Sequence, residues 1–180
     1  MNLPAQFRRL NLLTGWVVFA IAATVYVLTL EPTASFWDCG EYIACAWGLE
    51  SGHPPGAPFF MILGRAFGLL SFGNNENVAW LINCMSGIAS AATVMFLFWT
   101  ITHLAKKIIL RYSHDFSQTR IVLVMVAGMC GALTYAFTDS FWFSAVEGEV
   151  YALSSLFTAV VFWAMLRWED EAHEARSDRW

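Results

Sequence analysis

Four stretches of the chain are long and apolar enough to cross a lipid bilayer. They are residues 10–30, 78–102, 121–138 and 150–166, and none of them contains a Lys, Arg, Asp or Glu. A membrane-spanning helix needs roughly 17–25 mostly apolar residues, because lipid offers no partners to its backbone polar groups. The pattern therefore predicts an all-α fold, a polytopic transmembrane helical bundle with four spans.

The first of these stretches could be mistaken for a signal peptide, because Arg8 and Arg9 precede it. Its apolar run is longer than the core of a signal peptide, and Glu31-Pro32 follows without a small-residue cleavage site. We therefore expect a first helix that is retained.

The basic residues predict the orientation of the bundle, because cytoplasmic segments carry an excess of Lys and Arg. With both termini in the cytoplasm, nine of the ten basic residues lie in inner segments: Arg8, Arg9, Lys106, Lys107, Arg111, Arg120, Arg167, Arg176 and Arg179. The outer segments then hold Arg65 alone. We expect an N-in, C-in arrangement, with residues 168–180 as a charged cytoplasmic tail.

The outer loop between the first two spans covers residues 31–77, far more than the usual connector of about 2–8 residues. Residues 38–50 contain no Pro and could form a short helix, and residues 59–72 form an apolar stretch interrupted by Arg65. A stretch of this length is more typical of an interfacial helix than of a span. We expect interfacial helices joined by a turn at residues 52–58.

Composition supports the membrane interpretation. The chain is 58% hydrophobic and 13% charged, whereas soluble domains average about 45–50% and 25%. The four cysteines show no metal-type spacing. Cys39 and Cys45 would face different sides of one helix, which disfavours a disulfide between them, and Cys84 and Cys130 fit small packing residues within spans.

The outer loop also contains the clearest candidates for chemistry. Asp38 and Glu41 are three residues apart, so a helix would place both carboxylates on one face, flanked by Trp37 and Tyr42. Such a pair could share a divalent metal ion, or one acid could raise the pKa of the other so that it serves as a base. The alternative is ordinary solvated charge beside the membrane.

His53 follows in the same loop, where Pro54 and Pro55 stiffen the backbone after it. Its ring could be a metal ligand, a proton donor or a hydrogen-bonding turn residue. Arg65 could reach lipid phosphate or contact a substrate that carries phosphate.

A second acidic motif lies where the third span ends and the fourth begins. Glu147 and Glu149 are bordered by apolar residues, and acids at membrane depth are functional candidates. Glu147 and Tyr151 are four residues apart, so one helical face could bring them together. The alternative is that the two acids mark the boundary with water.

Three motifs together resemble a known family. They are an aromatic-Asp-x-x-Glu-Tyr motif at residues 37–42, Gly-His-Pro-Pro-Gly at residues 52–56 and Ser-Ala-Val-Glu-x-Glu-Val-Tyr at residues 144–151. This set resembles a bacterial membrane family of unknown function that is related to the GT-C glycosyltransferases. Animal relatives of that family resemble protein O-mannosyltransferases. The resemblance covers nearly the whole chain.

The resemblance implies a transferase that moves a sugar from a polyprenyl-phosphate carrier to an acceptor hydroxyl on a protein or lipid. It implies that Asp38 is the catalytic base, that Glu41 orients the acceptor or binds a metal, and that His53 shapes the pocket. Glu147 and Glu149 would complete an acidic rim. The site would face the periplasm or exterior of a bacterial inner or plasma membrane.

Such enzymes have more spans than four, so the resemblance implies that residues 1–180 form the N-terminal part of a longer GT-C-like domain. The other partners we expect are membrane lipids, with no nucleic acid. No cofactor is certain beyond the candidate divalent metal. Two other functions stay open, a non-catalytic membrane scaffold or accessory subunit and a transporter or flippase. A transporter predicts polar residues deep in several spans, and the sequence contains few.

Overall fold

The structure is a computed structural model that describes residues 3–113 and 116–172. These residues form helices and no strand, which confirms the predicted all-α class. The helices are α1 (Leu3–Leu28), α2 (Cys39–Gly48), α3 (Pro58–Leu69), η1 (Asn75–Asn77), α4 (Val78–Tyr112), α5 (Gln118–Ala136), α6 (Asp139–Ala145) and α7 (Val150–Glu171). Four of them, α1, α4, α5 and α7, are long and apolar enough to cross a membrane.

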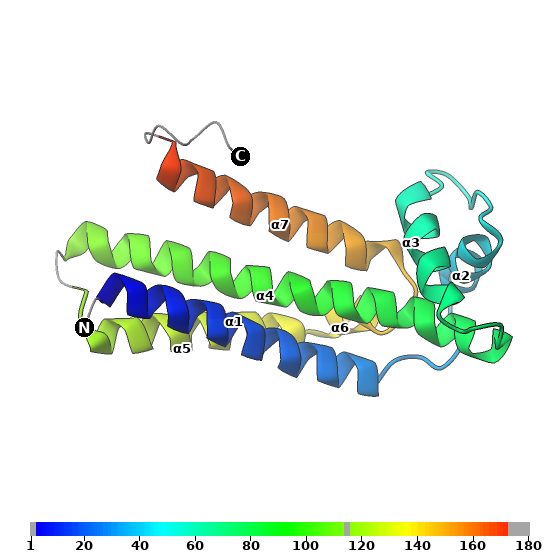
Figure 1. The fold of residues 1–180 in the computed structure, drawn as a ribbon, viewed down its shortest axis with the longest axis horizontal. Coiled ribbons are helices and arrows are strands. Elements are labelled where there is room, and N and C mark those ends of the chain that lie inside the picture. The colour runs from blue at the N-terminus through cyan, green and yellow to red at the C-terminus, as the bar shows by residue number, and fades with distance from the viewer. Residues whose placement is uncertain (1–2, 114–115, 173–180) are drawn as a thin grey trace.

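Helix α4 is the centre of the bundle, with α1 and α5 packed along one side and α7 along another (Figure 1). The most apolar part of α4 is 72% buried, whereas that of α7 is 11% buried. In a membrane protein the apolar faces left open suit lipid or further helices. The fold is therefore that of an integral membrane protein built around α4.

The length of α4 exceeds what a bilayer needs. Its 35 residues extend about 52 Å at 1.5 Å per residue, against a hydrocarbon core of about 30 Å. The expected span at residues 78–102 is the apolar part, and the helix continues through Lys106, Lys107 and Arg111 to Tyr112. The basic residues of α4 therefore lie beyond its apolar part.

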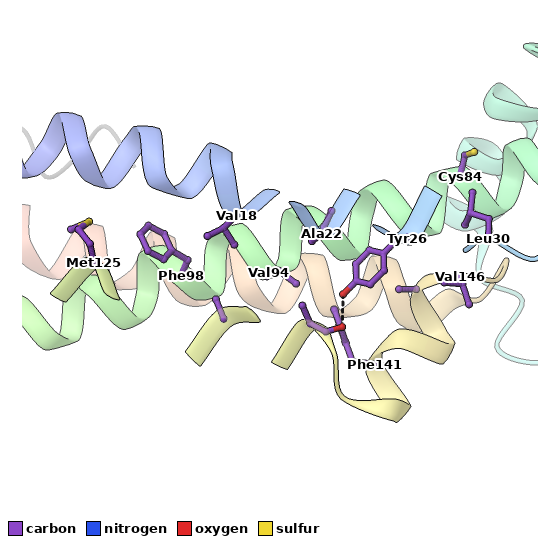
Figure 2. Close-up of a cluster of buried hydrophobic side chains, with 14 of the residues drawn as sticks. Val18, Ala22, Tyr26, Leu30, Cys84, Val94, Phe98, Met125, Phe141 and Val146 are labelled. Carbon is purple, nitrogen blue, oxygen red and sulfur yellow. Dashed lines mark hydrogen bonds between the residues drawn. The ribbon is translucent and has the colours of Figure 1, made fainter. Parts of the chain in front are cut away.

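The main hydrophobic core lies between α1, α4 and α5 (Figure 2). Tyr26 is fully buried there, and its hydroxyl donates a hydrogen bond of 2.8 Å to the carbonyl oxygen of Ala136. A buried phenol needs such a partner, because an unsatisfied hydroxyl is costly away from water. This bond ties the end of α1 to the end of α5.

Helices α2 and α3 form a pair beside the N-terminal end of α4, and α3 runs across the bundle axis (Figure 1). A Cβ added at Gly64 would lie 2.8 Å from the Cβ of Ala46, so the glycine permits the close approach of the two helices. The short helices expected in the outer loop are confirmed. Their position at the membrane surface stays a prediction, as does the N-in, C-in orientation.

Three details differ from the sequence expectations or extend them. Cys39, Cys45 and Cys84 are buried free thiols, so the expected absence of a Cys39–Cys45 disulfide holds in the structure. Cys130 is exposed on α5, so its interpretation as a packing residue is wrong within this chain. Helix α6 was not expected, because its seven residues are too few to show a helical period.

Candidate active site

His53 is bound to Glu41 at two points. The backbone N–H of His53 donates to Oε1 of Glu41 at 2.7 Å, and the ring Nδ1 lies 3.1 Å from Oε2. The loop after α2 is thereby fixed to a side chain of α2 itself. The ring of His53 also packs against that of Tyr42, with the centroids 5.6 Å apart.

Asp38 lies on the other side of the same imidazole. It is the N-cap residue of α2, yet its side chain makes no cap hydrogen bond. Its Oδ2 lies 3.7 Å from Nε2 of His53, and the Asp38 side chain is 57% exposed. The predicted juxtaposition of Asp38 and Glu41 is therefore present, and His53 lies between them.

The two carboxylates differ in their hydrogen bonds. The backbone N–H of His53, and after it the ring of His53, hold the pKa of Glu41 below its usual value. Glu41 therefore stays ionised and is occupied by two contacts. The carboxylate of Asp38 forms no hydrogen bond with any described residue. A group that must accept a proton needs such a free oxygen.

Asp38, Glu41 and His53 could also hold a divalent metal ion. One ligand atom from each lies within 4.8 Å of the others, and all three side chains are exposed. Two carboxylate oxygens and an imidazole nitrogen match the donors that Zn²⁺ or Mn²⁺ accepts, and three protein ligands leave positions open for substrate. The structure thus brings His53, a candidate ligand from the sequence, together with the two candidate acids.

Glu147 and Glu149 lie in the loop between α6 and α7 and are buried, with 3% and 7% of their surface exposed. Burial, together with the nearby charges of Glu147 and Asp38, raises the pKa of Glu149 to about 7. Burial also raises the pKa of Glu147, although a hydrogen bond donated by Ser35 opposes this shift. The two acids are therefore buried rather than solvated, and their interpretation as markers of the water boundary stays a prediction.

The two acidic motifs meet at one end of the bundle. A Cβ added at Gly148 would lie 3.0 Å from Oδ1 of Asn83 and 3.1 Å from Cγ1 of Ile43, so this loop packs directly on α2 and α4. Burial raises the pKa of Tyr42, and the charges of Glu149 and Asp38 add to the shift. Tyr42 thus lies within the electrostatic reach of acids from both motifs.

Asn83 connects these segments and was not among the residues expected in the site. It is fully buried, and its amide nitrogen donates to the carbonyl oxygens of Glu31 and Thr33 at 2.7 and 3.0 Å. The backbone N–H of Glu31 donates in turn to Val146 at 3.0 Å. Asn83 therefore fixes the start of the outer loop beside the loop that carries the second motif.

Glu147 and Tyr151 do not share a helical face, which the sequence had left as a possibility. Helix α7 begins only at Val150, so Glu147 lies in the preceding loop. Tyr151 is 63% exposed on the first turn of α7, whereas Glu147 is buried against Ser35. The Gly at position 148 and the turn from Glu147 to Glu149 prevent a continuous helix.

Arg65 packs against the protein, whereas Trp37 is exposed. The guanidinium of Arg65 lies 4.1 Å from the ring centroid of Trp47 and donates to the Trp47 carbonyl, so it holds α3 against α2. Trp37 is 88% exposed next to Asp38, with φ at 63°. Its ring is free to contact a substrate or lipid, and binding by either residue stays a prediction.

These features define the class of the protein: it is an integral membrane protein whose helical bundle carries two acidic motifs at one end. The family model described as "Protein O-mannosyl-transferase TMEM260 N-terminal domain" matches residues 38–180 of the chain. The chain belongs to this family, which confirms the resemblance to protein O-mannosyltransferases.

Two curated relatives agree with this assignment. The chain is 30% identical over 154 residues to "Protein O-mannosyl-transferase TMEM260" of Mus musculus, covering 85% of this chain and 19% of that protein. It is 26% identical over 145 residues to "Protein O-mannosyl-transferase tmem260" of Dictyostelium discoideum, covering 81% and 16%. The chain thus spans less than a fifth of either relative. No solved structure matches it.

Proposed function

We propose that this chain carries catalytic residues of a GT-C-type membrane glycosyltransferase. The enzyme would transfer a sugar, mannose by analogy with the names of the relatives, from a polyprenyl-phosphate carrier to a Ser or Thr hydroxyl. The observation that carries the proposal is the meeting of two acidic motifs, more than a hundred residues apart in sequence, at Tyr42 and Gly148. A scaffold has no need for this arrangement.

Asp38 is the proposed base. Its carboxylate takes the proton of the acceptor hydroxyl while that oxygen attacks the anomeric carbon of the sugar. The bond from the anomeric carbon to the phosphate oxygen breaks, and the polyprenyl phosphate leaves with the electron pair. A displacement of this kind inverts the anomeric carbon, and the phosphate is already a good leaving group, so one base suffices.

Glu41 and His53 position Asp38 and the acceptor. Their mutual contacts keep the imidazole 3.7 Å from Asp38, so His53 limits where the Asp38 carboxylate can lie. A divalent ion bound by the three side chains would neutralise charge on the phosphate. Arg65 is the proposed alternative contact for that phosphate, as the one basic residue between residues 31 and 77.

Glu149 and Glu147 line the acceptor or sugar side of the site. With its pKa raised to about 7, Glu149 can be protonated near neutral pH, and a protonated carboxyl can donate a hydrogen bond to a sugar hydroxyl. The lipid carrier accounts for a site at the end of a membrane bundle, on the non-cytoplasmic face in the proposed N-in orientation. In a bacterium this face is periplasmic or exterior.

A gene deletion in the source organism tests this function. Mass spectrometry of exported proteins should find hexose on Ser or Thr in the parent strain, lose it in the deletion strain and recover it when the gene is returned. Identical glycans in the parent and deletion strains would refute the glycosyltransferase. Full recovery by the gene carrying Asp38→Asn would favour the scaffold.

A further inference from the structure

A cavity lies at the end of the bundle far from the acidic motifs. It has a volume of about 1140 Å³ and is lined by residues from the N-terminal part of α1, the C-terminal half of α4 and the C-terminal half of α7. Small-molecule sites usually measure about 300–1,000 Å³. The cavity therefore has room for a large ligand or for part of a lipid.

The charge around this cavity is strongly positive. Its lining includes five basic side chains, and Asp170 is the acid among the described lining residues. Asp170 is already engaged, because its carboxylate lies 3.2 Å from Nζ of Lys107 and 3.6 Å from Nδ1 of His103. Lys107 also pairs with Glu169 at 2.8 Å. The carboxylates of Glu169 and Asp170 on α7 are therefore already paired with neighbouring basic side chains.

Three of the cations keep their charge unmatched. Within residues 3–113 and 116–172, Arg8 and Arg111 form no ion pair, and the ammonium of Lys106 lies 5.2 Å from the ring centroid of Phe7. Arg8 comes from α1, and Lys106 and Arg111 come from α4. Guanidinium groups on two helices can bind one phosphate from two sides, with paired N–H donors.

Part of the cavity wall is apolar. Leu12, Trp99, Leu110 and Trp163 line it, and the rings of Trp99 and Trp163 lie 5.9 Å apart. A cavity that is cationic at one side and apolar at the other fits an amphipathic anion better than a soluble one. Basic pockets between membrane helices at the cytoplasmic surface are known places for anionic lipid headgroups.

We propose that this cavity binds an anionic phospholipid of the leaflet at that surface. The phosphate lies between Arg8, Lys106 and Arg111, and an acyl chain follows Leu12 and Trp163 into the bundle. Bound there, the lipid bridges α1, α4 and α7 at the end where α7 has its weakest burial. This site is separate from the proposed active site and does not depend on it.

The test is native mass spectrometry of the intact protein, purified in detergent and titrated with dioleoyl phosphatidylglycerol or dioleoyl phosphatidylcholine. The two lipids share their acyl chains and differ in net charge. One phosphatidylglycerol should bind at least tenfold more tightly, on the order expected from two or three basic residues near a phosphate. Equal binding of the two lipids would overturn the proposal.

Charge-matched variants locate the site. Arg8→Gln with Arg111→Gln should remove most of the preference for phosphatidylglycerol, whereas Arg9→Gln with Arg120→Gln removes the same charge outside the cavity and should leave it. An equal loss in both pairs would show a general surface effect and contradict the assigned cavity. Excess inorganic phosphate should not displace the lipid, and displacement would point to a soluble anion instead.

Discussion

Glu41 binds both the backbone and the ring of His53, twelve residues further along the chain. Its Oε1 accepts the His53 N–H at 2.7 Å, and its Oε2 lies 3.1 Å from Nδ1. One carboxylate therefore sets the path of the loop and the orientation of the imidazole next to Asp38. Three of the expected site residues depend on this single relationship.

We predict that Glu41→Gln loosens the loop at His53. Hydrogen exchange measured by mass spectrometry should speed up about fivefold across residues 51–57, because the charged acceptor of the His53 amide is lost. Glu50→Gln, at a neighbouring exposed acid, should leave the exchange unchanged. Unchanged exchange in Glu41→Gln would show that the loop is held by other contacts.

The same pair predicts an acid-sensitive step. Because the folded-state pKa of Glu41 is lowered from 4.5, its contribution is present above pH 4.5 and is lost as the pH falls through the lowered value. Loop protection in the unmodified protein should therefore persist at pH 6 and disappear on acidification below 4.5. The Glu41→Gln variant should lack this step.

Glu149 predicts a pH dependence of the opposite sign. Its folded-state pKa is raised from 4.5 to about 7, so its contribution is present below pH 4.5 and is lost as the pH rises through 7. The free energy of unfolding should fall between pH 5 and pH 8.5 by at most about 3 kcal/mol, and the apparent melting temperature should fall with it. Glu149→Gln should flatten this decline, and an identical profile in the variant would contradict the raised pKa.

Asn83→Ala should destabilise the protein. The variant removes the two hydrogen bonds that the Asn83 amide donates to the carbonyl oxygens of Glu31 and Thr33, which costs roughly 1–3 kcal/mol. Thermal unfolding in detergent should show the loss. The matched control is Asn77→Ala, because Asn77 is exposed and makes no cap hydrogen bond with its side chain. Equal melting temperatures for both variants would remove Asn83 as the link between the loops.

The orientation can be tested with introduced cysteines. Ser51→Cys lies on the exposed outer loop and Tyr112→Cys at the exposed end of α4. With N-in topology, a membrane-impermeant maleimide added to intact cells should label the first and spare the second. Native Cys39 is unsuitable, because it is fully buried. The reverse labelling pattern would overturn the proposed topology.

Much of the fold follows from local pattern. The apolar stretches predict the four long helices, because uninterrupted apolar runs of this length have few other solutions in a membrane protein. The absence of Pro between residues 38 and 50 predicts α2, and the spacing of Asp38 and Glu41 predicts their common face. Helix α6 is too short for such a signal.

The tertiary part of the site could not be derived in this way. Burial of Glu147 depends on Ser35, and the position of the second motif depends on Asn83 and Gly148, all of them distant in sequence. One signal was present for Asn83: an amide inside an apolar span needs partners, because an unsatisfied polar group is costly there. The sequence does not say which partners those are.

The most direct test of the central claim is the rate of sugar transfer by the intact protein carrying Asp38→Asn. The substitution keeps the size of the side chain and removes the base, so the rate should fall by about 10²–10⁴. Asp139→Asn is the matched control, since Asp139 is an exposed acid at the start of α6, and it should keep the full rate. A rate for Asp38→Asn equal to that of the control would contradict Asp38 as the base.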